Sequence, residues 1–435
     1  MSETSNSPQG QKPKTPRVAI ASLVFGILSL CTLEVSDQSA WRLFVEHELA
    51  VIALRASVLV GLVLGIVAIV KIGKSNGRLK NEITLNEWGK IMKCRTSKLL
   101  LLALAGLLSA NCWGELRSNR GASPLDALPA WIKRVTHFGQ RGDFSHDGTR
   151  ILFIEKTFGD VYEVELDTSV IRPMTHHYYH EGYTRALYLA NGDVLLSGAR
   201  QFDANDPLAS RSEKNAELWV LKKDLSGAPV PLVEKCSEGP AVSRKHMRIA
   251  WTQGGAFYLA NIIYKNGKPE LANKKKILDK RDLPFETGLE TQNFRPPDEK
   301  ELIFSAYGYQ GTEVMGLNIE TGKVVNYSQA PNQYDEPEGI FPDGKHTLVE
   351  CDKHSGKGIH YNDIYKLALD GSGQTERMTF FADYPGYKAT NPVVSDDGRY
   401  MAFQYAKRGD WAGVGRGILI FDLQMYSRMK KSQDK

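Results

Sequence analysis

The chain has 435 residues, enough for two or three ordinary domains, and 55 Lys and Arg against 50 Asp and Glu give it a formal net charge of +5. This excess does not indicate a nucleic-acid partner, because residues 71–98 alone carry eight basic and two acidic side chains. The rest of the chain must therefore be close to neutral or mildly acidic.

The N-terminal third predicts a tail and a membrane domain. Residues 1–17 are rich in Ser, Pro, Gln and Lys with almost no apolar side chains, which predicts a disordered cytoplasmic tail. Residues 18–72 contain two almost wholly apolar runs, Val18–Leu33 and Ala56–Val70, which predict a two-helix membrane hairpin. Each run is short for a spanning helix, so a buried or re-entrant hairpin stays an alternative.

Charge predicts the orientation of this hairpin. The segment 73–98 after the second run is basic, and the loop between the runs is acidic, so both the N-terminus and 73–98 are expected in the cytoplasm. The runs Ala19-Ile-Ala-Ser-Leu-Val-Phe-Gly and Gly65-Ile-Val-Ala-Ile-Val-Lys-Ile-Gly are similar to those of a small bacterial two-helix membrane domain of unknown function.

A third apolar stretch lies in residues 99–114. Its core, Leu99–Leu108, has the length and flanks of a signal-sequence core more than of a full span. Three interpretations stay open: a short third span, cleavage near Gly114, or a lipid anchor on Cys112. All three predict that the following residues lie outside the cytoplasm.

A degenerate repeat then recurs roughly every 45 to 55 residues from Phe144 to Phe403. Each copy places a tight turn between two short apolar runs, as in Phe144-Ser-His-Asp-Gly-Thr-Arg-Ile-Leu-Phe153 and Val394-Ser-Asp-Asp-Gly-Arg-Tyr-Met-Ala-Phe403. This pattern is typical of a β-hairpin. A third run rich in β-branched and aromatic residues follows each hairpin, and a fourth run follows every copy but the last.

These repeats predict an all-β fold, a six-bladed β-propeller over residues 131–423 that follows N-terminal transmembrane helices. The last copy lacks its fourth strand, because the chain ends there in a charged C-terminal tail, 424–435. The segment Lys133-Arg-Val-Thr-His137 looks like the missing element. We expect this N-terminal strand to close the propeller as the outer strand of the sixth blade, since an open ring would leave unpaired edges.

The repeat resembles that of TolB-type propellers, whose blades carry a Ser-Pro-Asp-Gly hairpin, an Asp-Ile-Tyr strand and a terminal Leu-Thr. The resemblance covers about Trp131 to Leu423, and the second copy departs most, with Ala190 and Asn191 in place of Pro-Asp. It implies the fold rather than an activity, because similar repeats occur in peptidase propellers and in oligogalacturonate-lyase-like enzymes.

Three glutamates occupy equivalent positions about seven residues before a hairpin turn: Glu238, Glu290 and Glu336. The loops that carry them share one face of a propeller, so we expect all three at the mouth of the central channel. They would contact a ligand there or accept hydrogen bonds from neighbouring loop amides. The corresponding loop of the first copy adds His180 and Glu181 as candidate ligand-binding residues.

Histidines in the same set of loops make a divalent metal possible, although no other cofactor is expected. The candidate ligands are His180, His354 and His360, and imidazole suits transition metals whereas carboxylates suit harder ions. Their spacing matches no defined metal motif.

The sequence favours a non-enzymatic binding or scaffolding module in the bacterial envelope, with a protein or glycan partner and no nucleic acid. By this interpretation the chain is anchored in the inner membrane, with the propeller in the periplasm or another extracytoplasmic space. The alternative is a metal-assisted enzyme similar to oligogalacturonate lyases, in which Arg185 or Lys357 would bind a uronate carboxylate.

Overall fold

The computed structural model describes residues 123–410 and 413–433. The predicted tail 1–17, hairpin 18–72, basic segment 73–98 and third apolar segment 99–114 lie outside these residues. Among the helices within the described ranges, none is both long and apolar enough to cross a membrane.

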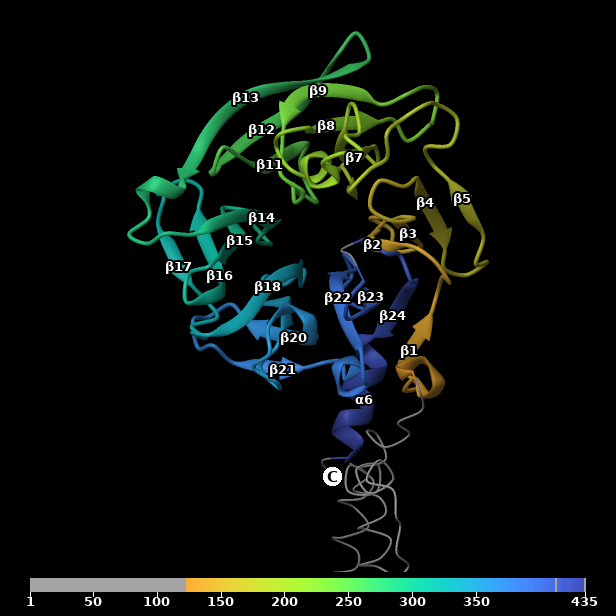
Figure 1. Cartoon of the computed structure of the whole chain (residues 1–435), viewed down its shortest axis with the longest axis vertical. Helices are drawn as coiled ribbons and strands as arrows, with labels where there is room; N and C mark the ends of the chain where they lie inside the picture. The colour runs from red at the N-terminus through yellow and green to blue at the C-terminus, as the bar shows by residue number, and fades with distance from the viewer. Residues whose placement is uncertain (1–122, 411–412, 434–435) are drawn as a thin grey trace, which may run out of the picture. The chain divides into compact units, whose positions relative to one another are not determined.

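The described residues form antiparallel sheets that follow one another around a centre (Figure 1). The first three sheets each run in chain order from a strand near the centre to a strand at the rim. Their strands are β2 (Gln140–Phe144), β3 (Arg150–Ile154), β4 (Val161–Glu165) and β5 (Ile171–Pro173); β6 (Arg185–Tyr188), β7 (Val194–Ala199), β8 (Ala216–Leu221) and β9 (Val230–Lys235); and β10 (Ala241–Val242), β11 (Arg248–Gln253), β12 (Ala256–Lys265) and β13 (Lys268–Asp279).

An eight-stranded sheet follows and consists of two four-stranded halves. Its strands are β14 (Gly288–Phe294), β15 (Glu301–Tyr307), β16 (Gly311–Asn318) and β17 (Val324–Asn326), then β18 (Gln333–Ile340), β19 (His346–Cys351), β20 (Asp363–Ala368) and β21 (Thr375–Arg377). The halves are joined by a short parallel pairing of β16 with β18, in which Gly311 lies opposite Gln333. A Cβ atom on Gly311 would lie 2.3 Å from the Gln333 carbonyl oxygen, so only glycine allows this approach.

The last sheet joins the two ends of the described chain. It contains β22 (Tyr387–Val394), β23 (Tyr400–Lys407) and β24 (Ile418–Asp422), and β1 (Ile132–Arg134) is its outermost strand. β1 pairs antiparallel with β24, with Ile132 opposite Phe421. The expected pairing of the segment after Trp131 with the last repeat is therefore confirmed, and the order of sheets is that of a β-propeller.

Apolar residues that alternate along these strands pack between neighbouring sheets. Phe257 of β12 and Phe304 of β15, for example, are fully buried and meet with ring centroids 5.1 Å apart. Short 3-10 helices connect some of the strands; they are η1 (Pro124–Ala127), η2 (Pro207–Arg211), η3 (Lys280–Asp282), η4 (Ile359–Tyr361) and η5 (Phe381–Asp383).

The charged C-terminal stretch is more than the tail that the sequence suggested. Residues Leu423–Gln433 form the helix α6, which begins directly after β24. Leu423 is buried, and the ring of Tyr426 lies 5.6 Å from that of Trp131 and 5.2 Å from that of Phe421. These contacts were not visible in the sequence, because α6 has only a few apolar side chains and a basic C-terminal end.

We expect the pairing of β1 with β24 to be important for stability. Ile132 is 7% exposed and packs in the core cluster with Phe403 and Leu419, so Ile132→Ala should lower the free energy of unfolding by about 2 kcal/mol or more. Val170→Ala is the matched control, because Val170 is 55% exposed and should tolerate the change. Urea unfolding measures the free energy of unfolding of both variants. If Ile132→Ala lowers it no more than Val170→Ala does, the pairing of β1 contributes little to stability.

Candidate functional site

The strands nearest the centre carry irregularities that turn side chains toward the central channel. β2, β14, β18 and β22 each shift register by one residue against their partner strand, which is the signature of a β-bulge. The shifts fall at equivalent places along the four strands. The residues left without a register partner include Arg141, Gln292, Glu338 and Asn391.

Three carboxylates of one sheet converge beside the channel. Glu336 and Glu350 lie directly opposite each other on β18 and β19, and Glu338 occupies the bulge of β18. One carboxylate oxygen from each of the three lies within 4.8 Å of the other two. Glu338 and Glu350 are buried, with 7% and 4% exposure. We call Glu336, Glu338 and Glu350 the acid cluster.

Two asparagines hold the acid cluster in place. Asn362 Nδ2 donates to Glu350 at 3.0 Å, and Asn391 donates to Glu338 through Nδ2 at 2.8 Å and to Glu350 through its backbone N–H at 2.8 Å. Asn362 is completely buried, yet its Oδ1 atom has no hydrogen-bond partner. An unpaired buried carbonyl oxygen is costly unless something else binds it.

Tyrosine hydroxyls link the acid cluster to Glu290. The Tyr307 hydroxyl lies 2.6 Å from Glu290 Oε2 and also contacts Glu336, and the Tyr334 hydroxyl contacts the second oxygen of Glu336. A hydroxyl has one proton, so Tyr307 can donate to only one of its two carboxylates. Burial raises the pKa of Glu336, so that carboxyl can supply the proton for its own contact.

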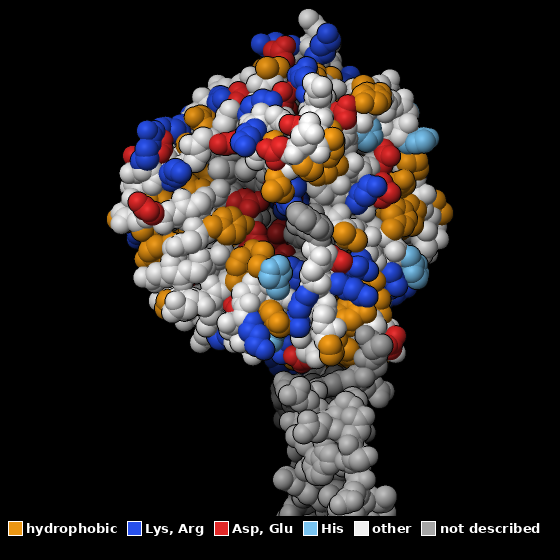
Figure 2. Space-filling model, in the orientation of Figure 1, with side chains coloured by type: hydrophobic (Ala, Val, Ile, Leu, Met, Phe, Trp, Pro, Cys, Tyr) orange, Lys and Arg blue, Asp and Glu red, His pale blue; other side chains and the backbone are white. Residues whose placement is uncertain are grey.

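Arginines balance part of this charge. Arg185 Nη1 lies 3.6 Å from Glu338, and Arg141 and Arg211 both form ion pairs with Glu238. The acid cluster with Glu238 and Glu290 thus presents five carboxylates to these three guanidinium groups. Figure 2 shows acidic side chains at the bottom of a hollow near the centre of the face that it displays.

Burial and mutual repulsion keep the acid cluster partly protonated near neutral pH. Loss of solvent and the neighbouring Glu338 raise the pKa of Glu336 to about 8. Burial raises the pKa of Glu338 to about 7 in spite of Arg185, and burial with Glu336 nearby raises that of Glu350 to about 7. The three carboxyls lie so close that they titrate as one unit.

The acid cluster has the chemistry of a site for a hard divalent cation. Its donors are all carboxylate oxygens, their spacing suits one ion, and the unpaired Asn362 Oδ1 belongs to the amide that touches Glu350. Such an ion would replace the protons and relieve the repulsion.

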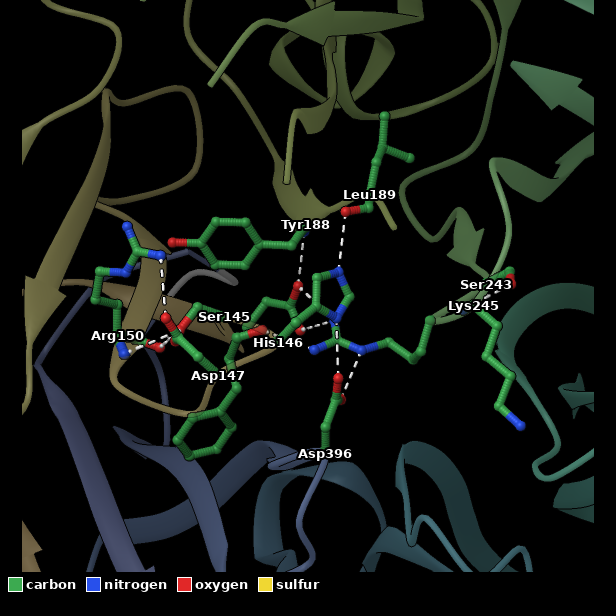
Figure 3. A network of polar contacts seen from close by, with 12 residues as sticks. Ser145, His146, Asp147, Arg150, Tyr188, Leu189, Ser243, Lys245 and Asp396 are labelled. Carbon is green, nitrogen blue, oxygen red and sulfur yellow. Dashed lines mark hydrogen bonds and ion pairs between the residues drawn. The ribbon is translucent and has the colours of Figure 1, made fainter. Parts of the chain in front are cut away.

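A polar network spans the side of the channel where the hairpin turns lie (Figure 3). Arg244, which follows β10, reaches the last sheet at Asp396 Oδ1 (2.8 Å) and the first sheet at the Phe144 carbonyl oxygen (2.8 Å). His146 connects Asp396 at 2.9 Å to the Leu189 carbonyl oxygen at 2.9 Å, as Figure 3 shows. The hydrogen bond to Asp396 raises the pKa of His146. Next to this network lies a cavity of about 240 Å³, which Arg185 and Glu338 also line.

The structure brings the three predicted glutamates close to one another. Glu290 and Glu336 share the Tyr307 hydroxyl, and a Cβ atom on Gly239, the residue after Glu238, would lie 2.2 Å from Glu290 Oε1. Glu238 itself is engaged by arginines. These contacts do not test whether a ligand binds there, so that role stays a prediction.

His180 and Glu181 have local partners instead. His180 Nδ1 accepts from the Gly182 backbone N–H at 2.9 Å, so the ring donates from Nε2 to Asp160 at 2.9 Å. Glu181 accepts from the Tyr179 hydroxyl at 2.6 Å. Neither residue belongs to a group of three or more potential metal ligands within the described ranges.

His354 and His360 lie apart from the acid cluster. His354 groups with Asp363 and Asp383, but Arg377 donates to both carboxylates, at 2.5 and 2.7 Å, and so supplies the positive charge there. Burial and Arg377 lower the pKa of His354 to about 4, which keeps its imidazole neutral. His360 is exposed and falls in neither of the two potential ligand groups that the described residues contain.

Sequence reasoning missed the residues that complete the acid cluster, Glu338, Glu350 and Asn362. The hairpin register could have predicted Glu350. Counting outward along both strands from the turn after Ile340 places Glu350 close to Glu336. The bulge that places Glu338 left no signal in a single sequence.

No family model matches the chain, and no curated protein matches its sequence. Solved structures with a similar fold include an oligogalacturonate lyase in complex with manganese, with 13% identity, a TM-score of 0.40, and coverage of 66% of this chain and 77% of the lyase. TolB from Acinetobacter baumannii matches at 15% identity and a TM-score of 0.34, covering 66% of this chain and 67% of TolB.

A protein of unknown function from Bacteroides thetaiotaomicron matches at 12% identity and a TM-score of 0.44, covering 67% of this chain and 75% of that protein. Likenesses this weak carry no information about activity. The propeller assignment comes from the sheet topology of the chain itself.

The raised pKa values predict how stability depends on pH. Between the ordinary glutamate pKa near 4.5 and the folded-state values near 7 to 8, the folded protein retains protons that the unfolded chain releases. The free energy of unfolding should therefore fall as pH rises from about 5 to 8, by about 1.4 kcal/mol per pH unit for each such proton.

Glu336→Gln should make this decline shallower, because Gln cannot ionise and can still bond to both tyrosines. Urea unfolding at several pH values with a chelator present measures the slopes, and Glu181→Gln is the control outside the acid cluster. Equal slopes for the wild-type protein and Glu336→Gln would contradict the assignment.

Proposed function

We propose that this chain is a six-bladed propeller that acts as a cation-dependent binding module. Each half of the eight-stranded sheet counts as one blade, and the pairing of β1 with β24 completes the sixth. In this proposal a divalent cation binds to the acid cluster, and the surrounding loops present a protein or glycan partner to it.

The observation that carries the proposal is the convergence of Glu336, Glu338 and Glu350, with the Asn362 side-chain amide donating to Glu350. Three like charges within 4.8 Å of one another are unfavourable in a buried site. A cation removes this cost, and oxygen donors select a hard ion such as Ca²⁺ or Mn²⁺. The Tyr307 hydroxyl then connects Glu336 of the site to Glu290.

We place the module in the bacterial envelope, tethered to the inner membrane by the N-terminal segments, with the propeller outside the cytoplasm. The positive-inside distribution of charge and the third apolar stretch 99–114 support this location. A binding role fits better than a metal-assisted lyase. The lyase hypothesis drew its ligands from His180, His354 and His360, and none of the three belongs to the acid cluster.

Calorimetric titration of the chelator-treated protein with Ca²⁺ and with Mn²⁺ tests the proposal. We expect one cation per chain and tighter binding at pH 8 than at pH 6, because protons compete for the same oxygens. Glu350→Gln should weaken the affinity by at least about tenfold, since changes beyond the direct ligands already cost that much. Glu181→Gln should leave it unchanged.

If neither ion binds at pH 8, the proposal of a cation site at the acid cluster is wrong. Formation of a new double bond when the loaded protein is mixed with oligogalacturonides, followed by ultraviolet absorbance, would instead favour the lyase. Equal effects of Glu350→Gln and Glu181→Gln would place any observed cation elsewhere.

A further inference from the structure

Helix α6 lies on the rim of the propeller, across the outermost strands of two neighbouring sheets. Its Tyr426 hydroxyl donates to Glu376 of β21 at 2.9 Å, and the same ring packs against Trp131, just before β1. In Figure 1, β1 and α6 lie side by side at the bottom of the view. The helix is therefore attached to the rim and lies away from the channel.

The C-terminal half of α6 is basic. Arg428, Lys430 and Lys431 are all exposed, and they line a cavity of about 650 Å³ together with Lys366. Among the described residues, Glu376 is the one acidic side chain that lines the cavity, and it pairs with Lys430. We call Arg428, Lys430 and Lys431 with Lys366 the basic rim. Its excess of positive charge fits phosphate-bearing anions.

The described chain begins beside this helix. Leu125 and Leu128, within and just after η1, pack against the core cluster that contains Leu423, and Tyr426 packs there too. Eight residues, 115–122, separate Ser123 from Gly114, where the third apolar segment ends. Even fully extended, eight residues reach no further than about 30 Å. A span at 99–114 would thus hold this part of the rim close to the bilayer.

We propose that the basic rim binds anionic lipid headgroups of the membrane that anchors the chain, so that the propeller is held with its rim toward the bilayer. Lys and Arg side chains are attracted to an anionic surface, and this attraction decays within a Debye length. This inference rests on the membrane tether of the proposed function and is independent of the cation site.

The acid cluster and the basic rim lie at different places on the propeller. The acid cluster is on β18 and β19, whereas the basic rim lies by β21, the outermost strand of that sheet. Contact through the rim leaves both ends of the channel facing the aqueous compartment, where a partner can reach the loops.

The test uses the full chain in lipid nanodiscs, either of phosphatidylcholine alone or with about a third of phosphatidylglycerol. Lysines are acetylated with an amine-reactive ester, and mass spectrometry follows the rate at each position. Lys431 should react at least about threefold more slowly in the anionic discs, and high salt should abolish this protection. Lys268 and Lys275, exposed on β13 of another sheet, serve as internal controls and should not change.

Arg428→Glu with Lys431→Glu should remove the protection of Lys430, whereas the matched pair Lys268→Glu with Lys275→Glu should not. The proposal would be wrong if Lys431 were labelled at the same rate in neutral and anionic discs. It would also be wrong if high salt left the slower labelling in anionic discs unchanged. Release of the chain from membranes by alkaline carbonate would overturn the tether itself. Calcium titration of the same samples shows separately whether the cation site is intact.

Discussion

The repulsion among Glu336, Glu338 and Glu350 is the constraint on which the centre of this protein depends. Three carboxyls on adjacent strands of one sheet cannot all ionise in a buried place without a compensating charge. The chain supplies part of that charge with Arg185, and tyrosine and asparagine donors satisfy several of the carboxylate oxygens. The remainder must come from protons or from an ion, so the state of the site depends on the surrounding solution.

The propeller scaffold makes this arrangement sustainable. Neighbouring sheets are held together by buried apolar contacts, such as that of Phe257 with Phe304, well away from the channel. The parallel pairing at Gly311 and Gln333 also joins the two halves of the eight-stranded sheet, and it lies directly before Tyr334 and Glu336. Buried apolar contacts between the sheets thus offset the repulsion among the central carboxyls.

The repeat predicted most of the fold because each copy contains the turn and the two apolar runs of a β-hairpin. Turn pairs such as Asp147-Gly148 fix where strands end, and the basic segment Lys133-Arg134 was recognisable as a displaced outer strand. The helix α6 escaped prediction because its stability comes from Trp131, about 290 residues earlier in the chain, and not from a strong apolar stripe of its own.

The site was harder to predict than the fold. Equivalent loop positions predicted Glu238, Glu290 and Glu336 as a group, and the structure places Glu290 and Glu336 on the same tyrosine hydroxyl. Glu338 depends on a β-bulge, and a bulge changes which residues face the channel without leaving a local sequence signal. The histidine predictions remain untested: a loop position shows that a side chain can reach a face, but not which neighbours it meets there, such as Asp160 beside His180.

The guanidinium of Arg244 connects parts of the chain that are far apart in the sequence. From the end of β10 it binds Asp396 of the last sheet and the Phe144 carbonyl oxygen of the first sheet. These contacts need all three sheets in place, so they report on the order of sheets around the whole centre. Arg244 and Glu338 also line the same cavity, so a molecule that fills this cavity would contact both the cross-link and the acid cluster.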